Sequence, residues 1–374
     1  MPNDVETLIV GASAAGLATA ACLRAAGREL EVLEAADAVG QEWRERYDRL
    51  HLHTPKAASG LPGLAMPAHW PRYPSRDQVV EYLERYRLHH WIEPRFGRRV
   101  TRLERRGDAW VATTPDGEWS ARHVVVATGA NRRPVRPVWP GLEQFTGEVL
   151  HSSEYRTGAA WTGRDVLVVG FGNSACEQAV DLVEHGARPH LAVRSAVNVL
   201  PRDLFGILPV LQLGIVLQHV PPQVADALAR PLIRLTVGDL GAVGLRKAPY
   251  GPNVQIARDH RIPLLDAGTM AHLRAGRIAV HGGIERFTER EVVFTDGERL
   301  RVDVVVLATG FRPALEEFLT PWREVCDAHG APLVSGYPTA LPGLWFCGQY
   351  VSPAGMLREI GIEARRIAAQ IAGG

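Results

Sequence analysis

The sequence predicts an α/β fold built from two dinucleotide-binding, Rossmann-like domains, with the second domain inserted into a discontinuous first one. Two observations lead to this prediction. Glycine-rich turns open at Gly11 and Gly170, and each lies between a short β-rich run and a helix-forming stretch. Two apolar runs, 124–129 and 304–310, end in the same Ala-Thr-Gly turn. Each run is expected to close one nucleotide-binding sheet and to lead the chain across to the other domain.

The first glycine turn belongs to a predicted βαβ unit. Residues 7–10 form a short strand, 14–26 favour a helix, and 30–34 are typical of a second buried strand. The same order recurs from Asp165. Its strand, helix and second strand are expected at 166–169, 173–184 and 190–194. Because the whole unit recurs, and not the glycine pattern alone, we expect two nucleotide sites.

The domain crossings are expected near 130–160 and 310–315. The Pro-rich connector 134–140 supports the first crossing, because residues before proline favour extended conformations. The predicted first domain comprises residues 1–155 and 313–374, and the second comprises 156–312. A helical insertion is expected at about 200–246, with its helices broken by Pro209, Pro221, Pro222 and Pro231. It packs on the second domain, lines a substrate tunnel or faces a membrane.

Length and composition suit a two-domain globular protein. The chain has 374 residues, of which 46% are hydrophobic and 22% charged. The net charge of +1 gives no reason to expect nucleic acid as a partner. Of the 42 basic residues 40 are Arg, since only Lys56 and Lys247 are lysines. We interpret this excess of arginine as the coding bias of a GC-rich bacterial genome.

The cysteines and the apolar segments favour a reduced, cytoplasmic protein. Cys22, Cys176, Cys326 and Cys347 show no CxxC pair and no metal-ligand spacing, so no metal site is expected. No secretory signal is visible. The apolar stretch 204–217 is shorter than the ~20 residues of a spanning helix.

The first turn, 11–16, fits the pattern GxGxxG from Gly11 to Gly16, except that Ser13 replaces the central glycine. That position needs a small side chain so that backbone N–H groups can approach a pyrophosphate. Glu34, at the end of the next strand, can accept hydrogen bonds from ribose hydroxyls. These features predict a bound dinucleotide. The alternative is a tight turn with a surface glutamate.

The second turn, 170–175, has Gly170 and Gly172 in the glycine positions and Ala175 in the third. Arg194 and Ser195 follow its second strand, where an NAD site carries an acid. A guanidinium and a hydroxyl can bind a 2′-phosphate, so this half favours NADPH over NADH. An exposed, solvated Arg-Ser pair is the alternative.

Between the two turns lies the run FxGxxxHxxxY, formed by Phe145, Gly147, His151 and Tyr155. Further stretches accompany it: 40–43, 47–56, 73–75, 193–195, 199–202 and 308–312. On these stretches the sequence resembles the class B flavin-dependent monooxygenases over nearly its whole length. Within them it is similar to the YUCCA-type indole-3-pyruvate monooxygenases and their bacterial relatives.

The resemblance implies two cofactors, FAD and NADPH. The residues it assigns to FAD are Gly11, Ser13, Ala14, Gly16, Glu34, Gln41, Trp43, Leu52, His53, Thr128, Gly129, Gly348 and Gln349. The residues it assigns to NADPH are Gly170, Gly172, Asn173, Ser174, Ala175, Arg194, Ser195, Thr309 and Gly310.

Two histidines carry alternative interpretations. The resemblance places His53 beside the isoalloxazine, where animal-type members have an asparagine. A catalytic role and simple packing under the flavin both remain open for it. His151 is expected to act as a structural joint, because its motif is expected to span the domain crossing. Direct catalysis is the alternative, although this chemistry needs no strong protein base.

The implied reaction uses NADPH to reduce FAD and a C4a-(hydro)peroxyflavin to insert one oxygen atom from O2 into a small organic substrate. N-oxygenation, S-oxygenation and oxidative decarboxylation of an α-keto acid all fit. Arg202, Arg246 and Arg312 are candidate partners for a substrate carboxylate. The alternatives are an NADPH oxidase that produces hydrogen peroxide and a non-oxygenating FAD/NADPH-binding protein. A disulfide reductase would need a redox-active cysteine pair. A homodimer is a possible assembly.

Overall fold

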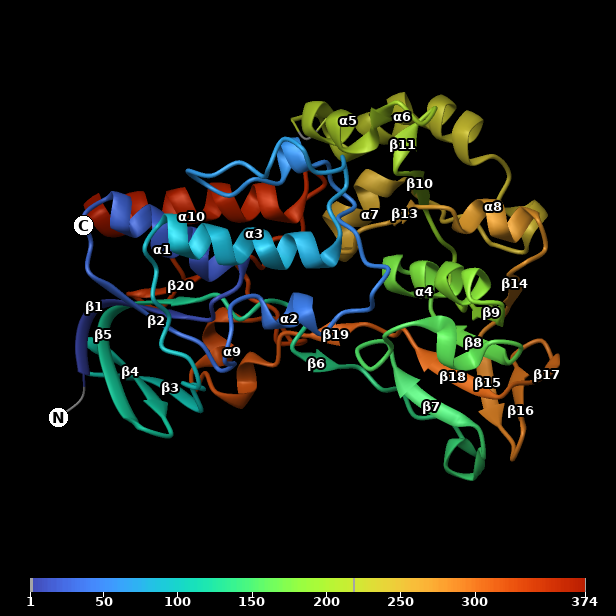
Figure 1. Cartoon of the computed structure of the whole chain (residues 1–374), viewed down its shortest axis with the longest axis horizontal. Helices are drawn as coiled ribbons and strands as arrows, with labels where there is room; N and C mark the ends of the chain where they lie inside the picture. The colour runs from blue at the N-terminus through green and yellow to red at the C-terminus, as the bar shows by residue number, and fades with distance from the viewer. Residues whose placement is uncertain (1–2, 218, 374) are drawn as a thin grey trace. The chain divides into compact units, whose positions relative to one another are not determined.

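The computed structural model describes residues 3–217 and 219–373, and it divides into two compact units (Figure 1). Unit 1 consists of the chain up to Glu45, Thr54–Arg133 and the chain from Phe311. Unit 2 consists of Arg46–His53 and Pro134–Gly310. The short strands β6 (Arg133–Pro134) and β19 (Phe311–Arg312) stand where the chain leaves unit 1 and returns to it.

Unit 1 is built on a six-stranded sheet of order β2-β1-β5-β4-β3, in which β20 also pairs with β5. Its strands are β1 (Asn3–Val10), β2 (Leu30–Leu33), β3 (Arg102–Arg106), β4 (Ala109–Thr114), β5 (Gly117–Val126) and β20 (Leu344–Phe346). β1, β2, β5 and β20 are parallel, and β3 and β4 form an antiparallel extension. Val10, Leu33, Val126 and Phe346 share one register. The carboxyl ends of four strands therefore meet at one edge.

Helices cover the sheet of unit 1. They are α1 (Ala14–Ala25), α2 (Gln41–Arg44), α3 (Arg76–His89), α9 (Trp322–Val325) and α10 (Met356–Gly373). α1 packs against α3 and α10, and Figure 1 shows these three helices together. α1 is buried along most of its length, which its alanines and glycine permit because small side chains allow close packing. α3 begins with a capping box in which Ser75 and Gln78 bond reciprocally.

Unit 2 contains a five-stranded parallel sheet of order β14-β9-β8-β18-β7. Its strands are β7 (Glu148–His151), β8 (Asp165–Val169), β9 (Arg188–Ala192), β14 (Ala279–His281) and β18 (Val304–Leu307). β18 is fully buried, as strands of an all-parallel sheet with both faces covered usually are. His151, Val169, Ala192 and Leu307 share one register, so this sheet too presents aligned carboxyl ends.

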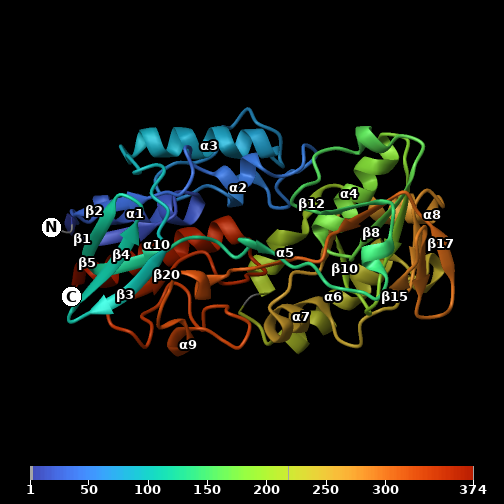
Figure 2. The ribbon, with the colours of Figure 1, turned by 90° about the horizontal axis from the view of Figure 1, so that it is seen from below.

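Smaller elements complete unit 2. α4 (Asn173–Glu184) packs on β8 and β9, and a meander of β15 (Ile284–Phe287), β16 (Glu291–Phe294) and β17 (Arg299–Arg301) follows β14. The remaining elements are β10 (Val199–Pro201), β11 (Asp203–Leu204), β12 (Leu208–Pro209), α5 (Val210–Leu217), α6 (Pro222–Val237), α7 (Pro252–Asp259), β13 (Leu264–Asp266) and α8 (Thr269–Arg274). α6 lies beside α7 (Figure 2).

The structure confirms the predicted α/β fold and corrects one detail. The expected strands and helix of each βαβ unit are present within about two residues of their predicted limits, except that β1 begins at Asn3, four residues before its predicted start. Pro231, however, lies inside α6 and does not break it. Packing of α6 against β10 and α7 compensates for the backbone hydrogen bond that a proline removes. Among the described residues, no helix is long and apolar enough to cross a bilayer.

Candidate functional site: two glycine turns at the carboxyl edges of two sheets

The first glycine turn directly follows β1, at the aligned carboxyl ends in unit 1. Gly11 has φ of +106°, and a Cβ there would lie 2.7 Å from the carbonyl oxygen of Ala127. A Cβ on Gly16 would lie 1.9 Å from the carbonyl oxygen of Gly11. Both positions therefore require glycine, because α1 starts in direct contact with the turn. Ser13, the N-cap residue of α1, makes no side-chain capping hydrogen bond.

Glu34 reaches from the end of β2 to this turn. One carboxylate oxygen accepts a hydrogen bond from the N–H of Ala12 at 2.6 Å, and the other from the N–H of Ala36 at 2.9 Å. The side chain is thus held at the sheet edge. This is where the carboxyl end of β2 places an acid for contact with a ribose in dinucleotide-binding folds.

Two buried polar atoms stand at the same edge without a hydrogen-bond partner among the described residues. They are the Oγ1 of Thr128, which follows β5, and the Nε2 of Gln349, which follows β20. β5 and β20 are neighbouring strands, so both atoms lie at adjacent strand ends. Buried polar atoms normally find partners. Their location beside the glycine cradle fits a bound polar group.

Four of the other predicted FAD residues, Gly129, Gly348, Gln41 and Trp43, also belong to unit 1. Gly129 and Gly348 have φ of +74° and +81°. The N–H of Gly348 donates to Glu363 of α10, a buried residue. Gln41 and Trp43 lie on α2, and both are partly buried. Leu52 and His53 belong to unit 2.

The second glycine turn follows β8 in unit 2. Gly170 has φ of +129°, and a Cβ there would lie 2.5 Å from the carbonyl oxygen of Ala308. A Cβ on Gly172 would meet nothing within 4 Å, so the turn leaves open space in front of α4. Asn173 uses its side-chain oxygen to accept a hydrogen bond from the N–H of Leu265 at 2.9 Å. Ser174 and Ala175 continue the first turn of α4.

A cationic group surrounds the loop after β9. Arg194 and Ser195 are exposed there. The guanidinium of Arg246 donates to the carbonyl oxygen of Arg194, and Lys247 forms a β-bridge with Val197. Arg246 and Lys247 are also exposed. Sequence reasoning considered Arg246 only for a substrate carboxylate and missed Lys247, although an adjacent Arg-Lys pair is a visible signal in a chain with two lysines.

The FxGxxxHxxxY residues lie in unit 2, after the chain has left unit 1. The expectation that this motif spans the crossing is therefore wrong. Phe145 packs edge-on against Phe287, with ring centroids 5.5 Å apart. A Cβ on Gly147 would lie 2.5 Å from the Phe145 ring and 2.7 Å from the carbonyl oxygen of Asp303. Packing inside unit 2 therefore accounts for the phenylalanine and the glycine of the motif.

His151 is fully buried at the end of β7. Its Nδ1 accepts a hydrogen bond from the N–H of Ser153 at 3.1 Å, so the ring proton lies on Nε2. Nε2 is 3.2 Å from the carbonyl oxygen of Gly310 and donates to it. Burial lowers the pKa of His151, so the neutral ring persists. The hydroxyl of Thr309 donates to the carbonyl oxygen of Val135.

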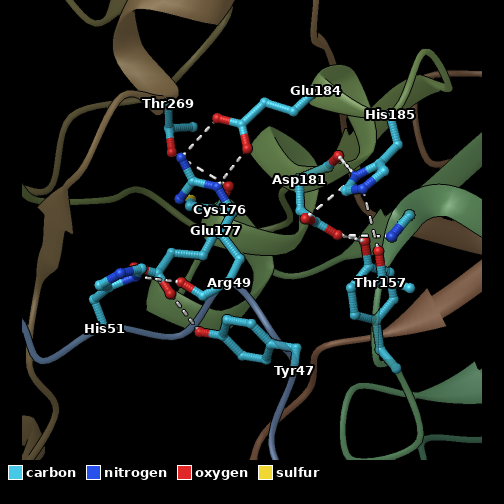
Figure 3. A network of polar contacts seen from close by, with 12 residues as sticks. Tyr47, Arg49, His51, Thr157, Cys176, Glu177, Asp181, Glu184, His185 and Thr269 are labelled. Carbon is cyan, nitrogen blue, oxygen red and sulfur yellow. Dashed lines mark hydrogen bonds and ion pairs between the residues drawn. The ribbon is translucent and has the colours of Figure 1, made fainter. Parts of the chain in front are cut away.

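One face of α4 carries three acidic residues whose side chains form hydrogen bonds or ion pairs with other segments of unit 2 (Figure 3). Glu184 forms a two-pronged ion pair with Arg49, with both distances 2.9 Å. Asp181 accepts a hydrogen bond from the hydroxyl of Tyr155 at 2.6 Å and another from the N–H of Gly158 at 2.7 Å. The spacing i, i+4, i+7 places Glu177, Asp181 and Glu184 on the same side of the helix.

Glu177 connects α4 to the segment 46–53. The hydroxyl of Tyr47 donates to its Oε2 at 2.6 Å, and the Nε2 of His53 lies 3.3 Å from its Oε1. Burial raises the pKa of Glu177 to about 7 and lowers the pKa of His53 to about 4. Both groups are therefore neutral between about pH 4 and pH 7. Sequence reasoning missed Glu177, because its position in the helix resembles any surface glutamate.

The described part of the chain contains neither a candidate metal site nor a disulfide bond. It contains no group of three or more His, Cys, Asp or Glu residues arranged to hold a metal ion. All four cysteines are free, and Cys176 and Cys347 are fully buried. Burial raises the pKa of both thiols, which makes them poor nucleophiles.

Known proteins resemble this chain in sequence. A family model described as pyridine nucleotide-disulphide oxidoreductase matches residues 8–202. Indole-3-pyruvate monooxygenase YUCCA1 from Oryza sativa subsp. japonica is 42% identical over 316 residues, which cover 83% of this chain and 78% of the relative. Probable indole-3-pyruvate monooxygenase YUCCA4 from Arabidopsis thaliana is 38% identical over 315 residues, with coverage of 83% and 77%. These relatives are plant proteins, so the expected bacterial origin stays a prediction.

Solved structures resemble it in fold. A flavin-containing monooxygenase from Stenotrophomonas maltophilia matches with a TM-score of 0.76 and 25% identity over 99% of both chains. A bacillithiol disulfide reductase from Staphylococcus aureus matches with a TM-score of 0.71 at 16% identity, which shows the shared fold alone. The chain belongs to the class B flavin-dependent monooxygenases, within the pyridine nucleotide-disulphide oxidoreductase family, and is an enzyme of that class.

Proposed function

We propose that this enzyme binds FAD in unit 1 and NADPH in unit 2 and inserts one oxygen atom from O2 into a small organic substrate. The observation that carries the proposal is the pair of glycine turns, each at the aligned carboxyl ends of a parallel sheet. Ligands of open α/β sheets bind at that edge. In this proposal the FAD domain is unit 1 and the NADPH domain is unit 2, which begins at Pro134 and not at residue 156 and also includes Arg46–His53.

The residues of unit 1 fit FAD. Gly11 and Gly16 form a cradle that a Cβ would fill, and α1 directs its N-terminal N–H groups at the position of a pyrophosphate. Glu34 would accept hydrogen bonds from the ribose, and Thr128 and Gln349 offer unpartnered polar atoms. Bound FAD supplies the oxygen-activating chemistry of the class. The chain's own contribution is to bind the cofactor, orient it and exclude water.

The residues of unit 2 fit NADPH. The open space at Gly172 admits a phosphate close to the N-terminus of α4. Arg194 and Ser195, with Arg246 and Lys247 beside them, provide positive charge and a hydroxyl for a 2′-phosphate. An NADH site would place an acid after β9, and this chain has none there.

The relatives' printed names favour an α-keto acid as substrate, since two of them are indole-3-pyruvate monooxygenases. We extend this to the present chain as the first substrate to test, with oxidative decarboxylation as the reaction. N- or S-oxygenation of a small amine or thioether is the second.

The test is a stoichiometry measurement on the purified flavoprotein. NADPH consumption, oxygenated product and hydrogen peroxide are measured with indole-3-pyruvate, an aromatic amine, a thioether and a cyclic ketone. We expect one of these substrates to yield about one molecule of oxygenated product for each NADPH consumed. Hydrogen peroxide equal to the NADPH consumed, with every substrate, would instead identify an NADPH oxidase. Failure to copurify with flavin or to be reduced by NADPH would contradict the cofactor assignment.

A further inference from the structure

The segment 204–237 of unit 2 concentrates exposed apolar side chains. Half of the large hydrophobic side chains that are exposed in the described part of the chain lie between Phe205 and Leu235. They are Phe205, Ile207, Leu208, Val216, Val224, Leu228 and Leu235, and we call them the 204–237 face. In Figures 1 and 2, α5 and α6 lie next to each other. Single exposed apolar residues are common, whereas a group of them marks an interaction surface.

α6 presents an apolar stripe on the side opposite to its buried face. Val224, Leu228 and Leu235 follow the helical spacing i, i+4, i+11, so they share one side of the helix. Leu228 is 64% exposed and Leu235 is 73% exposed. The residues that α6 buries lie on its opposite side, and they include Ala225, Asp226, Ala229 and Val237. The core of unit 2 therefore does not use the stripe.

The β11–β12 hairpin and α5 precede α6 and are also apolar at their surface. The two strands pair antiparallel, and the turn between them contains Phe205 and Ile207, which are 65% and 75% exposed. Phe205 has φ of +52°, a conformation that is uncommon for residues other than glycine. α5 contains no charged residue, and Leu211 is its one buried residue. Both elements thus hold apolar side chains in water, where burial would be favourable.

The charged residues of the segment are divided between its inner and outer sides. Asp226 is the only acid in 204–237, and it is buried. Its carboxylate accepts hydrogen bonds from the N–H groups of Asn253 and Val254 at 2.9 and 3.0 Å, where α7 begins. Arg230 and Arg234 are exposed, and they follow one flank of the apolar stripe. The outer side of α6 therefore combines apolar surface with positive charge.

An anionic bilayer surface matches this combination more closely than a protein surface does. Protein interfaces combine aromatic anchors with directed hydrogen bonds. In 204–237, Phe205 is the only Phe, Tyr or Trp residue, and the other members of the 204–237 face are aliphatic. Aliphatic side chains enter the acyl-chain region without needing directional partners. Arginines beside them can extend to headgroup phosphates.

We propose that the 204–237 face docks on the surface of a bilayer that contains anionic phospholipids. α6 lies parallel to that surface, with Leu228 and Leu235 at the boundary of the acyl chains and its two arginines among the headgroup phosphates. The tip of the β11–β12 hairpin places Phe205 at the same boundary. Docking needs neither cofactor nor turnover, so it is independent of the proposed function.

Cosedimentation of the purified whole protein with vesicles tests the docking. Wild type should bind vesicles of mixed phosphatidylcholine and phosphatidylglycerol at least about tenfold more tightly than phosphatidylcholine alone, because two arginines meet anionic headgroups. Leu228→Glu should weaken binding to the mixed vesicles at least about tenfold, since a charge replaces a side chain at the acyl boundary. The matched control Leu333→Glu, at a 63% exposed leucine of unit 1, should bind like wild type.

The arginines have a separate test. Arg230→Ala combined with Arg234→Ala should remove the preference for phosphatidylglycerol and keep the weaker binding to phosphatidylcholine alone. The control combines Arg290→Ala with Arg301→Ala, at two exposed positions of the same unit, and should retain the preference. Circular dichroism establishes that each variant is folded. A preference that survives the first pair of substitutions would contradict the role given to Arg230 and Arg234.

Phe205→Trp reports where the hairpin tip lies. With brominated acyl chains, the fluorescence of this variant should be quenched on binding by more than that of wild type, which has nine tryptophans. A vesicle-bound protein without this extra quenching would contradict the proposed orientation.

Two further results would overturn the docking itself. One is a folded wild-type protein that does not bind the mixed vesicles, or that loses binding equally in Leu228→Glu and Leu333→Glu. The other is a wild-type dimer in light scattering that Leu228→Glu converts to a monomer, without vesicle binding by either protein. That result would assign the 204–237 face to a second copy of the chain.

Discussion

Nε2 of His151 donates a hydrogen bond to the carbonyl oxygen of Gly310 at 3.2 Å, and this contact joins the ends of two neighbouring strands in unit 2. His151 ends β7, and Gly310 is the last residue of unit 2 before the chain returns to unit 1. The histidine of the FxGxxxHxxxY run thus fixes the turn that follows β18. We expect its role to be holding a strand end, which needs a neutral imidazole with one defined tautomer.

Replacing His151 by Ala should lower the free energy of unfolding by about 3 kcal/mol, because it leaves a cavity and removes a hydrogen-bond partner from the backbone groups of Gly310 and Ser153. Urea-induced unfolding at pH 7.5 measures the change, and His329→Ala, at an exposed position, is the control. A loss no larger than that of the control, together with a fall in the rate of flavin reduction, would indicate catalysis instead.

The same histidine predicts a pH dependence of stability. Burial lowers its pKa below the ordinary 6.5. Below about pH 6.5 the unfolded chain takes up a proton on this histidine that the folded protein resists, so stability should fall as the pH drops through this range. His151→Gln, which keeps a side-chain amide near Gly310, should reduce that dependence in urea unfolding curves recorded between pH 5 and 7.5. An unchanged slope would show that His151 titrates normally.

The fold could be predicted from the sequence because its signals are local. Gly11, Gly16 and Gly170 are required by contacts within a few residues or at the next strand, and each signal is visible as a glycine after an apolar run. Strand and helix limits followed from the periodicity of apolar residues.

The connections between distant segments could not be predicted in this way. Tyr47 and Glu177 are 130 positions apart, and nothing in the local pattern of residues 46–53 separates that segment from unit 1. The position of the FxGxxxHxxxY run was misjudged for the same reason, because the crossing at Pro134 is set by long-range packing. The candidate site was therefore predicted where glycines define it and missed where buried acids organise it.

A pair of glycine variants separates packing from cofactor binding. Gly147→Ala should destabilise the protein by roughly 2–4 kcal/mol, since its Cβ would clash with the Phe145 ring and the Asp303 carbonyl oxygen. Gly172→Ala should leave stability within about 0.5 kcal/mol, because it has open space and φ of −91°. Thermal unfolding measures both.

In NADPH binding the order of the two effects should be reversed, with Gly172→Ala causing the larger change. Gly172→Ala should weaken NADPH binding at least tenfold in a fluorescence titration, because the added methyl group occupies the space proposed for a phosphate. Unchanged NADPH affinity in a folded Gly172→Ala protein would remove this turn from the proposed NADPH site.

Arginine variants test the preference for NADPH. Arg194→Ala should raise the KM for NADPH roughly 10–100-fold and leave the KM for NADH nearly unchanged, since only NADPH carries the 2′-phosphate. Arg246→Ala should act in the same direction, because its guanidinium bonds the backbone of Arg194. Arg290→Ala, at an exposed position, is the control. Equal increases for both coenzymes would exclude Arg194 from phosphate binding.

A buried carboxyl group in unit 1 predicts a second pH effect, of opposite sign. Burial raises the pKa of Glu363 to about 7, although the N–H of Gly348 and the hydroxyl of Ser335 donate to it. Between about pH 4.5 and 7 the folded protein therefore holds a proton that the unfolded chain has released, and stability from this group is lost as the pH rises. In Glu363→Gln the loss should disappear. The free energy of unfolding of this variant relative to wild type should increase by up to about 3 kcal/mol between pH 5 and 8. Urea unfolding of the flavin-free protein measures it, with exposed Glu324→Gln as the control. A difference that stays constant with pH would show that Glu363 is ionised in the folded protein and that its two donors outweigh burial.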